Sequence, residues 1–276
     1  MRLLSVLAVS GTLVLASCGS DDAKADTTTT VADGEATPTT VDDNAPTTPG
    51  AQAASAEGAC KAYVGITMAL ASEPDGDPAA WFEDTILPMA DDLDANKPAA
   101  IEGELGTMID AVHKVADTGD MSAFEAPEFN EAKGTIDPYM FENCDFDQKI
   151  EVSGKEYAFE GLPDTIPAGR VAILFTNDGM EAHEITVASK QDGVTESFDD
   201  LLQMPEEQAM TKINMKGGAF APQKGDQSLL IADFEPGDYA ALCFVPTGTT
   251  MDDEGEHQGD GPPHFMEGMK AEFTVS

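Results

Sequence analysis

The stretch from Leu242 to Val275, LCFVPTGTTMDDEGEHQGDGPPHFMEGMKAEFTV, contains side chains of three kinds that can bind a soft metal ion. Cys243 ends one strand-like run, and His264 and Met269 stand just before the next. A thiolate, an imidazole and a thioether are donors that soft transition metals prefer. The same residues could also belong to an ordinary hairpin, so the elements around them must decide between the two interpretations.

From about Gln148 onward the sequence predicts short β-strands. Turn sequences such as PAG, NDG and EPG separate about seven β-rich runs, a pattern typical of a β-sandwich. One helical insert, SFDDLLQMPEEQAMTK, interrupts them. The predicted strands are KIEVSG, EYAFEG, RVAILFTN, HEITVAS, SLLIADF, DYAALCFV and KAEFTV.

Alternation along two of these strands places candidate ligands in the interior. Successive side chains of a strand point to opposite faces. His183 therefore shares a face with Ile185 and Val187, and Cys243 shares one with Tyr239. Both residues are expected to lie inside the sandwich, close to strand ends.

The segment from Gln148 to Ser276 resembles the cupredoxin family, the blue copper proteins. GDYAALC has the Gly-x-Tyr-x-x-x-Cys form of the penultimate strand of a cupredoxin, and HFMEGM has the His-x-x-x-x-Met spacing of its ligand loop. FTNDGMEAH is similar to the strand and turn that deliver the first histidine. The resemblance implies a Greek-key β-sandwich for residues 148–276.

Matched residue by residue, the resemblance implies a type 1 copper site. His183 and His264 would supply imidazole nitrogens, Cys243 a thiolate and Met269 a weak axial thioether. Two features depart from the family pattern: twenty residues, 244–263, separate Cys243 from His264, and Glu184 follows His183 where asparagine is common. The function implied is electron transfer.

Two other functions remain open for the same residues. The protein could store or deliver Cu(I), with Met251 and Met266 as additional ligands, or it could be a metal-free interaction module. An enzyme is not expected, and we predict no catalytic residues. Multicopper enzymes need a second centre built from further histidines, and the chain has four histidines in all.

Residues 57–147 are predicted to form a small helical bundle of three or four helices. Pro78 and Pro98 each stand at a favoured first-turn position. In PAAIEGELGTMIDAVHKVA the apolar residues recur at helical spacing on one face. The predicted fold class is therefore α+β, with the helical bundle preceding the cupredoxin-like sandwich.

In an oxidising compartment two of the cysteines could form a disulfide. Cys60 and Cys144 lie near the two ends of the helical segment, and we infer a disulfide between them, although three cysteines allow three pairings. That choice leaves Cys243 unpaired, either as a buried apolar residue or as a metal ligand.

The N-terminal sequence predicts an export signal. Residues 1–17 contain a positive Arg2, an apolar stretch and the sequence LASC, which resembles the lipobox of bacterial lipoproteins. By that resemblance Cys18 would be lipidated, with an ordinary secretory signal as the alternative. Residues 18–56, rich in Thr, Pro and Asp, are predicted to be a disordered stalk. The expected location is the outer, extracytoplasmic face of the cell membrane.

The charge balance limits the partners. With 14 basic and 52 acidic residues the formal net charge is −38, which disfavours binding to nucleic acid. A cationic redox partner protein would fit this surface, although the notably acidic charge could serve solubility alone, the simpler interpretation. The acidic insert at residues 247–261 has no role that the sequence specifies.

Overall fold

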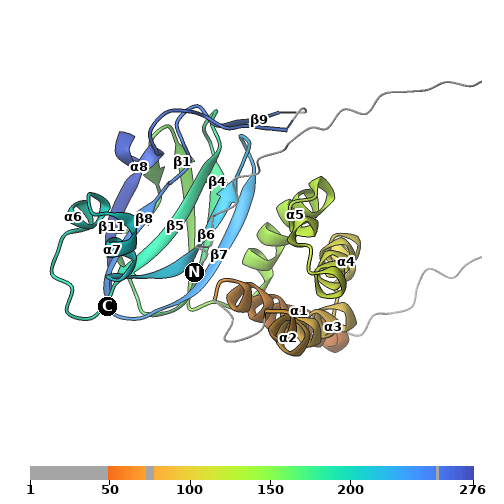
Figure 1. The fold of residues 1–276 in the computed structure, drawn as a ribbon. Helices are drawn as coiled ribbons and strands as arrows, with labels where there is room; N and C mark the ends of the chain where they lie inside the picture. The colour runs from red at the N-terminus through yellow and green to blue at the C-terminus, as the bar shows by residue number, and fades with distance from the viewer. Residues whose placement is uncertain (1–48, 73–77, 253–254) are drawn as a thin grey trace, which may run out of the picture. The chain divides into compact units, whose positions relative to one another are not determined.

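A computed structural model gives the fold of the chain (Figure 1). It describes residues 49–72, 78–252 and 255–276. The predicted signal peptide, the predicted lipidation residue Cys18 and most of the predicted stalk lie outside the described residues. No helix within these ranges is both long enough and apolar enough to cross a membrane.

Helices occupy the first described part of the chain, as the sequence predicts. Helix α1 begins at Pro49, before the predicted start at Glu57, because the segment AQAASAEGA is rich in alanine, the best helix former. Short 3₁₀ turns precede α4 and α5, and a π-helical turn joins α2 to α3. The helices are α1 (Pro49–Leu70), α2 (Pro78–Trp81), α3 (Leu87–Ala95), α4 (Glu102–Thr118) and α5 (Pro127–Asn143).

Helix α4 shows how the apolar periodicity is used. Leu105, Ile109 and Val112 recur on one face and are buried. The helix ends at Gly119, whose φ of 69° is a left-handed conformation that glycine adopts without strain. The face of α4 that the sequence predicted to be apolar is thus the face that packs in the core.

The structure contains the disulfide inferred from the sequence. Cys60 of α1 and Cys144, at the end of α5, are joined with an S–S distance of 2.09 Å. The two cysteines are 84 positions apart in the sequence. In the chain-entropy description, closing a loop of about that length stabilises a fold by roughly 4–5 kcal/mol. Among the described residues Cys243 is the free cysteine, and it is buried.

The second part of the chain is a two-sheet sandwich. One sheet has the order β2-β1-β4-β7, the other has the order β3-β11-β8-β5-β6, and β9 and β10 form a separate hairpin. The strands are β1 (Gln148–Lys155), β2 (Ala158–Glu160), β3 (Thr165–Ile166), β4 (Gly169–Asn177), β5 (His183–Lys190), β6 (Ile213–Ala221), β7 (Gln227–Phe234), β8 (Gly237–Leu242), β9 (Thr250–Asp252), β10 (Gly255–His257) and β11 (Lys270–Val275).

Several details of this region differ from the prediction, and the short strands β3, β9 and β10 were not predicted. Edge strand β6 was not predicted, because Gly217 and Gly218 break its alternation and its register against β5 shifts between Val187 and Ala188. The single predicted helical insert is two short helices, α6 (Phe198–Leu202) and α7 (Glu206–Met210), separated near Pro205.

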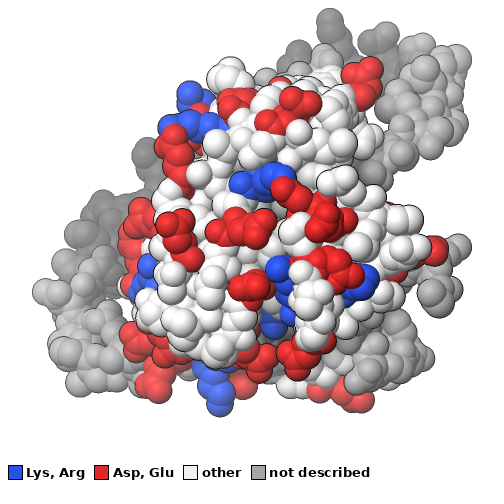
Figure 2. All heavy atoms as spheres, turned by 90° about the vertical axis from the view of Figure 1, so that its left-hand side faces the viewer, with Lys and Arg blue, Asp and Glu red and all other residues white. Residues whose placement is uncertain are grey.

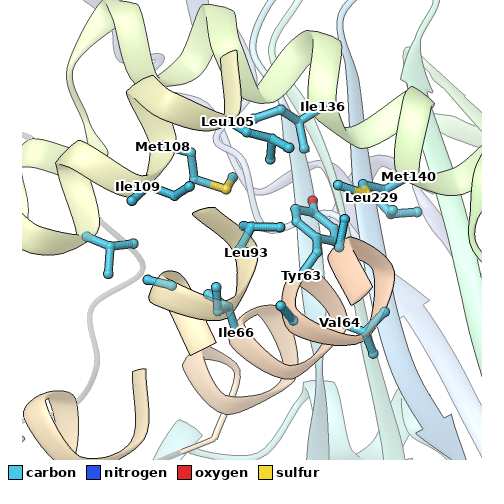
Figure 3. Close-up of a cluster of buried hydrophobic side chains, with 14 of the residues drawn as sticks. Tyr63, Val64, Ile66, Leu93, Leu105, Met108, Ile109, Ile136, Met140 and Leu229 are labelled. Carbon is cyan, nitrogen blue, oxygen red and sulfur yellow. The ribbon is translucent and has the colours of Figure 1, made fainter. Parts of the chain in front are cut away.

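The helices pack on the outer face of the first sheet. On β4, Ile173 and Phe175 point into the sandwich, whereas Leu174 belongs to the hydrophobic core of the helices. On β7, Leu229 likewise packs with helical residues such as Tyr63 (Figure 3). The change from helix to strand falls at the predicted boundary, residues 147 and 148. The outer face of the first sheet belongs to the same core as the helices, whereas the inside of the sandwich has a core of its own, and both regions lie in one compact unit.

A buried carboxylate joins the helices to the sheet. Asp137 of α5 is 0% exposed, and its side chain accepts the N–H of Leu229 on β7 at 2.8 Å. The same carboxylate accepts a hydrogen bond from the Tyr63 hydroxyl of α1 and pairs with Lys133. Burial, together with the charge of Asp137, raises the pKa of Tyr63 well above its ordinary value.

Candidate metal centre

Three of the four predicted ligands meet in one buried cluster. His183 Nδ1 lies 3.1 Å from His264 Nδ1, and Cys243 Sγ lies 3.4 Å from His264 Nδ1. Donor atoms of all three residues fall within 4.8 Å of one another. Each of these residues is 0% exposed, so the cluster is closed to bulk water.

Strand pairing explains why two of the ligands meet. His183 is the first residue of β5, and Cys243 directly follows β8. The two strands are antiparallel neighbours in which Thr186 pairs with Leu242. The start of β5 therefore lies beside the end of β8, and the alternation predicted from the sequence directs both side chains into the core.

The pairing of Pro246 with Pro263, called the pinch below, closes the base of the insert and places His264 beside the other two ligands. Pro246 and Pro263 form an isolated β-bridge. The His264 N–H donates to the Val245 carbonyl at 2.9 Å, and the Phe265 N–H donates to the Cys243 carbonyl at 2.9 Å. The twenty residues between Cys243 and His264 therefore leave the ligand spacing unaffected, because most of them lie beyond this closed base.

Met269 lies beside the cluster through its backbone. Its N–H donates to the His264 carbonyl at 2.9 Å, and its carbonyl accepts the Cys243 N–H at 3.2 Å. The side chain is 0% exposed and belongs to the same core as Cys243. A Cβ at Gly154 would lie 2.8 Å from Met269 Cε, so this glycine makes room for the thioether. The axial role of Met269 stays a prediction.

The Cys243 thiol is held protonated in the metal-free protein. Burial raises its pKa to about 12, although the Glu184 N–H, 3.5 Å from Sγ, opposes the rise. Metal binding must therefore displace this proton. The side chain of Glu184 accepts the Phe244 N–H at 2.9 Å, which fixes the residue next to the cysteine.

Both histidines are held neutral, as metal ligands must be. Burial lowers the pKa of His183, and the neighbouring His264 lowers it further. Burial also lowers the pKa of His264, against the opposing effect of Glu181. Two imidazoles with their Nδ1 atoms facing each other inside a protein core are thus both available as neutral donors.

The donor set fits a single metal ion. Metal–nitrogen bonds of about 2.0 Å and metal–sulfur bonds of about 2.3 Å place donors of a trigonal plane roughly 3.5 Å apart. The observed separations of 3.1 and 3.4 Å agree with that spacing. His183 Nε2 is a buried atom without a hydrogen-bond partner, and it faces Glu156 Oε1 at 3.6 Å. If Nδ1 binds metal, Nε2 carries the proton and points at this carboxylate.

Three nearby residues were not found from the sequence. Glu156 and Glu181 lie against the outer nitrogens of the two histidines, and the ring of Tyr157 packs on His264 with centroids 4.8 Å apart. No spacing rule links these residues, because loops bring them together. Burial would raise the pKa of Glu156, but the N–H groups of Met180 and the next residue outweigh burial and lower it to about 2.

Other candidate ligands lie outside the cluster. Met266, considered for Cu(I) storage, is 66% exposed. His113 on α4 pairs with Asp91 at 3.6 Å on the surface of the helical region. Within the described ranges, the His183–Cys243–His264 group is the one set of His, Cys, Asp and Glu residues spaced to hold a metal ion.

Comparison with known proteins finds similarity at the level of solved structures. No protein-family profile and no curated protein matches the chain. A reduced auracyanin from Roseiflexus castenholzii matches at 16% identity, covering 47% of this chain and 96% of its own, with a TM-score of 0.31. Rusticyanin from Thiobacillus ferrooxidans matches at 15% identity, covering 51% of this chain and 93% of its own, with a TM-score of 0.29.

A third match is auracyanin A, described as a blue copper protein, from Chloroflexus aurantiacus. It is 17% identical, covers 46% of this chain and 98% of its own, and has a TM-score of 0.27. The predicted fold class, a helical region followed by a two-sheet β-sandwich, is confirmed by the described elements and their pairing. The sandwich carries the buried His–Cys–His cluster.

Proposed function

We propose that the sandwich binds one copper ion at His183, Cys243 and His264 and carries single electrons to or from a partner protein. The observation that supports this function is the buried cluster of two facing imidazole Nδ1 atoms and one thiol within 4.8 Å. Two imidazoles and a thiolate in a plane, with a weak thioether, form the donor set of a blue copper electron-transfer site. Bound copper would supply the one-electron chemistry.

The chain's own residues do the rest. His183 and Cys243 are fixed by neighbouring strands, and His264 is fixed by the pinch that follows Val245. A core that surrounds all three side chains excludes water and resists movement of the ligands. Little rearrangement would then accompany a change of oxidation state, with Met269 as the proposed axial ligand.

Electron transfer is favoured over the two alternatives and over catalysis. Storage or delivery of Cu(I) requires donors that a partner can reach, whereas His183, Cys243 and His264 are fully buried. A metal-free interaction module would not require two neutral imidazoles facing a thiol. Catalysis of the multicopper kind would need a second cluster, and the part of the chain that the structure describes offers the single one.

We further propose that the protein is a lipoprotein anchored through Cys18 on the extracytoplasmic face of the membrane. The LASC sequence supports the anchor, and the Cys60–Cys144 disulfide is of the kind that persists outside the cytoplasm. A cationic redox partner is proposed from the charge of −38. Acidic side chains outnumber basic ones on the face drawn in Figure 2.

The test is a copper titration of residues 19–276 with the disulfide intact. Cu(II) should produce an intense thiolate-to-copper band in the visible spectrum at one equivalent. The band should disappear in Cys243→Ser and His183→Ala, and it should persist in His113→Ala, which removes an exposed histidine of α4. The absence of a band in the unchanged protein would refute the blue copper site, and stoichiometric Cu(I) binding without a band would favour storage.

A further inference from the structure

The outer edge of His264 is closed by a carboxylate. Glu181 Oε2 lies 3.0 Å from His264 Nε2 and also accepts the N–H of Gly248. Glu181 Oε1 accepts the hydroxyl of Tyr157 at 3.2 Å. The carboxylate side chain is 19% exposed, whereas the imidazole is 0% exposed. The ring of His264 therefore meets an acidic group on the side facing away from Cys243.

This contact fixes which ring nitrogen carries the proton. A carboxylate accepts hydrogen bonds and donates none, so His264 Nε2 must be the N–H and Nδ1 must hold the lone pair. That lone pair points at Cys243 Sγ and His183 Nδ1, 3.4 and 3.1 Å away. The imidazole is thus oriented for a metal before any metal arrives.

Glu181 also ties the ligand to the base of the acidic insert. Its carboxylate bonds Gly248, and the next residue, Ala182, donates its N–H to the Thr249 carbonyl at 2.9 Å. The Glu181 N–H donates to Glu156 Oε1 at 3.0 Å. Glu181 therefore joins His264 to the insert and to the loop before β5.

We propose that Glu181 is a positioning residue that holds His264 in its ligating tautomer and shifts bound copper toward the oxidised state. A carboxylate on the far nitrogen of a ligand histidine fixes the ring and makes the imidazole a stronger donor. A stronger, more negative donor set favours Cu(II) over Cu(I). The shift in potential rests on the proposed copper-binding function, whereas the tautomer is a property of the metal-free protein.

The first measurement is nitrogen-15 NMR of the imidazole rings in the metal-free protein. His264 should be neutral with its proton on Nε2, and Glu181→Ala should give a mixture of the two tautomers. A proton on Nδ1 in the unchanged protein would overturn the proposal. This experiment needs no copper, so it stands or falls separately from the blue copper site.

The second measurement is the copper reduction potential. Loss of a partner beyond the ligand shell costs roughly 10-fold to 100-fold in metal affinity. If Glu181→Gln weakens Cu(II) about tenfold more than Cu(I), the potential rises by about 59 mV for one electron. The matched control is Glu267→Gln, which removes the same charge from an exposed position on α8 (His264–Glu267), the helix that His264 begins.

Tyr157→Phe gives a second variant with the opposite sign. It removes a hydrogen-bond donor from Glu181 Oε1 and leaves the ring that packs on His264. The carboxylate then interacts more strongly with Nε2, so the potential should fall. Equal shifts in Glu181→Gln and Glu267→Gln, or a rise in Tyr157→Phe, would show that Glu181 contributes only general charge.

Discussion

Replacing Asp137 by alanine should destabilise the helices and the sandwich together. The change leaves the Tyr63 hydroxyl and the Leu229 N–H buried without their acceptor, and each such loss costs about 1–3 kcal/mol. Lys133 contributes little, because its side chain is 32% exposed and can turn to water. The free energy of unfolding should fall by about 2–6 kcal/mol, and the midpoint temperature by about 2–4 °C for each kcal/mol lost.

Urea unfolding followed by two probes tests this reasoning. Trp81 of α2 is the single tryptophan of the chain, so its fluorescence reports on the helices. The visible copper band reports on the sandwich. Because the two regions share a core, both signals should change at one midpoint, and Asp137→Ala should move both by the same amount.

The matched control is Glu131→Ala, an exposed carboxylate on the same helix, which should change stability by less than about 0.5 kcal/mol. A variant in which only the Trp81 transition moves would refute the shared core. A loss below about 1 kcal/mol in Asp137→Ala would refute the assigned hydrogen bonds.

Three further predictions follow from the core around the site. Burial raises the pKa of the Cys243 thiol from 9.0 to about 12, so the folded state binds this proton more tightly than the unfolded chain. The resulting stability is complete below pH 9 and is lost as pH rises toward 12, and the stability of metal-free protein relative to Cys243→Ser should shrink over that window in denaturant titrations. In Gly154→Ala the new Cβ would lie 2.6 Å from the ring of Phe175 and 2.8 Å from Met269 Cε, and we expect a loss of about 1–3 kcal/mol and an altered visible spectrum. Copper at about a thousand times its dissociation constant should raise the free energy of unfolding by about 4 kcal/mol, measured by calorimetry, and a chelator should reverse the effect.

Each of these three predictions has a result that would contradict it. A constant stability difference between pH 9 and 12 would mean that the Cys243 thiol is not buried as described. An unchanged spectrum in Gly154→Ala would argue against Met269 as the axial ligand. Unfolding that is insensitive to copper would mean that no ion binds the folded state.

The ligand set was implied by the resemblance of three sequence motifs to the cupredoxin pattern, and short-range rules support parts of it. Strand alternation directs His183 and Cys243 inward, and the spacing between His264 and Met269 lies within one loop. Apolar periodicity likewise located the core face of α4, and the position of two cysteines at the ends of one segment indicated the disulfide. The inferences on inward-facing side chains, on the helix face and on the disulfide need only the geometry of one element or of the chain between two residues.

What the sequence did not predict depends on contacts between distant segments. Glu181 contacts His264 because two loops converge, and the spacing of these two residues in the sequence does not indicate the contact. Strand β6 was missed because its glycines hide the alternation, and its pairing with β5 supplies the order. In the sequence, the apolar run that contains Leu174 predicts a buried strand, but it does not indicate that helices cover its outer face.

The pinch between Pro246 and Pro263 separates the length of the insert from the geometry of the metal site. For a flexible loop, doubling the number of residues costs only about 0.6 kcal/mol of closure entropy. Mutation could therefore lengthen, shorten or rewrite the tip of the insert without disturbing Cys243 or His264, as long as both prolines and Gly248 remain. The same tolerance makes the tip a practical place to graft an epitope or a fluorescent reporter while keeping the ligands in position.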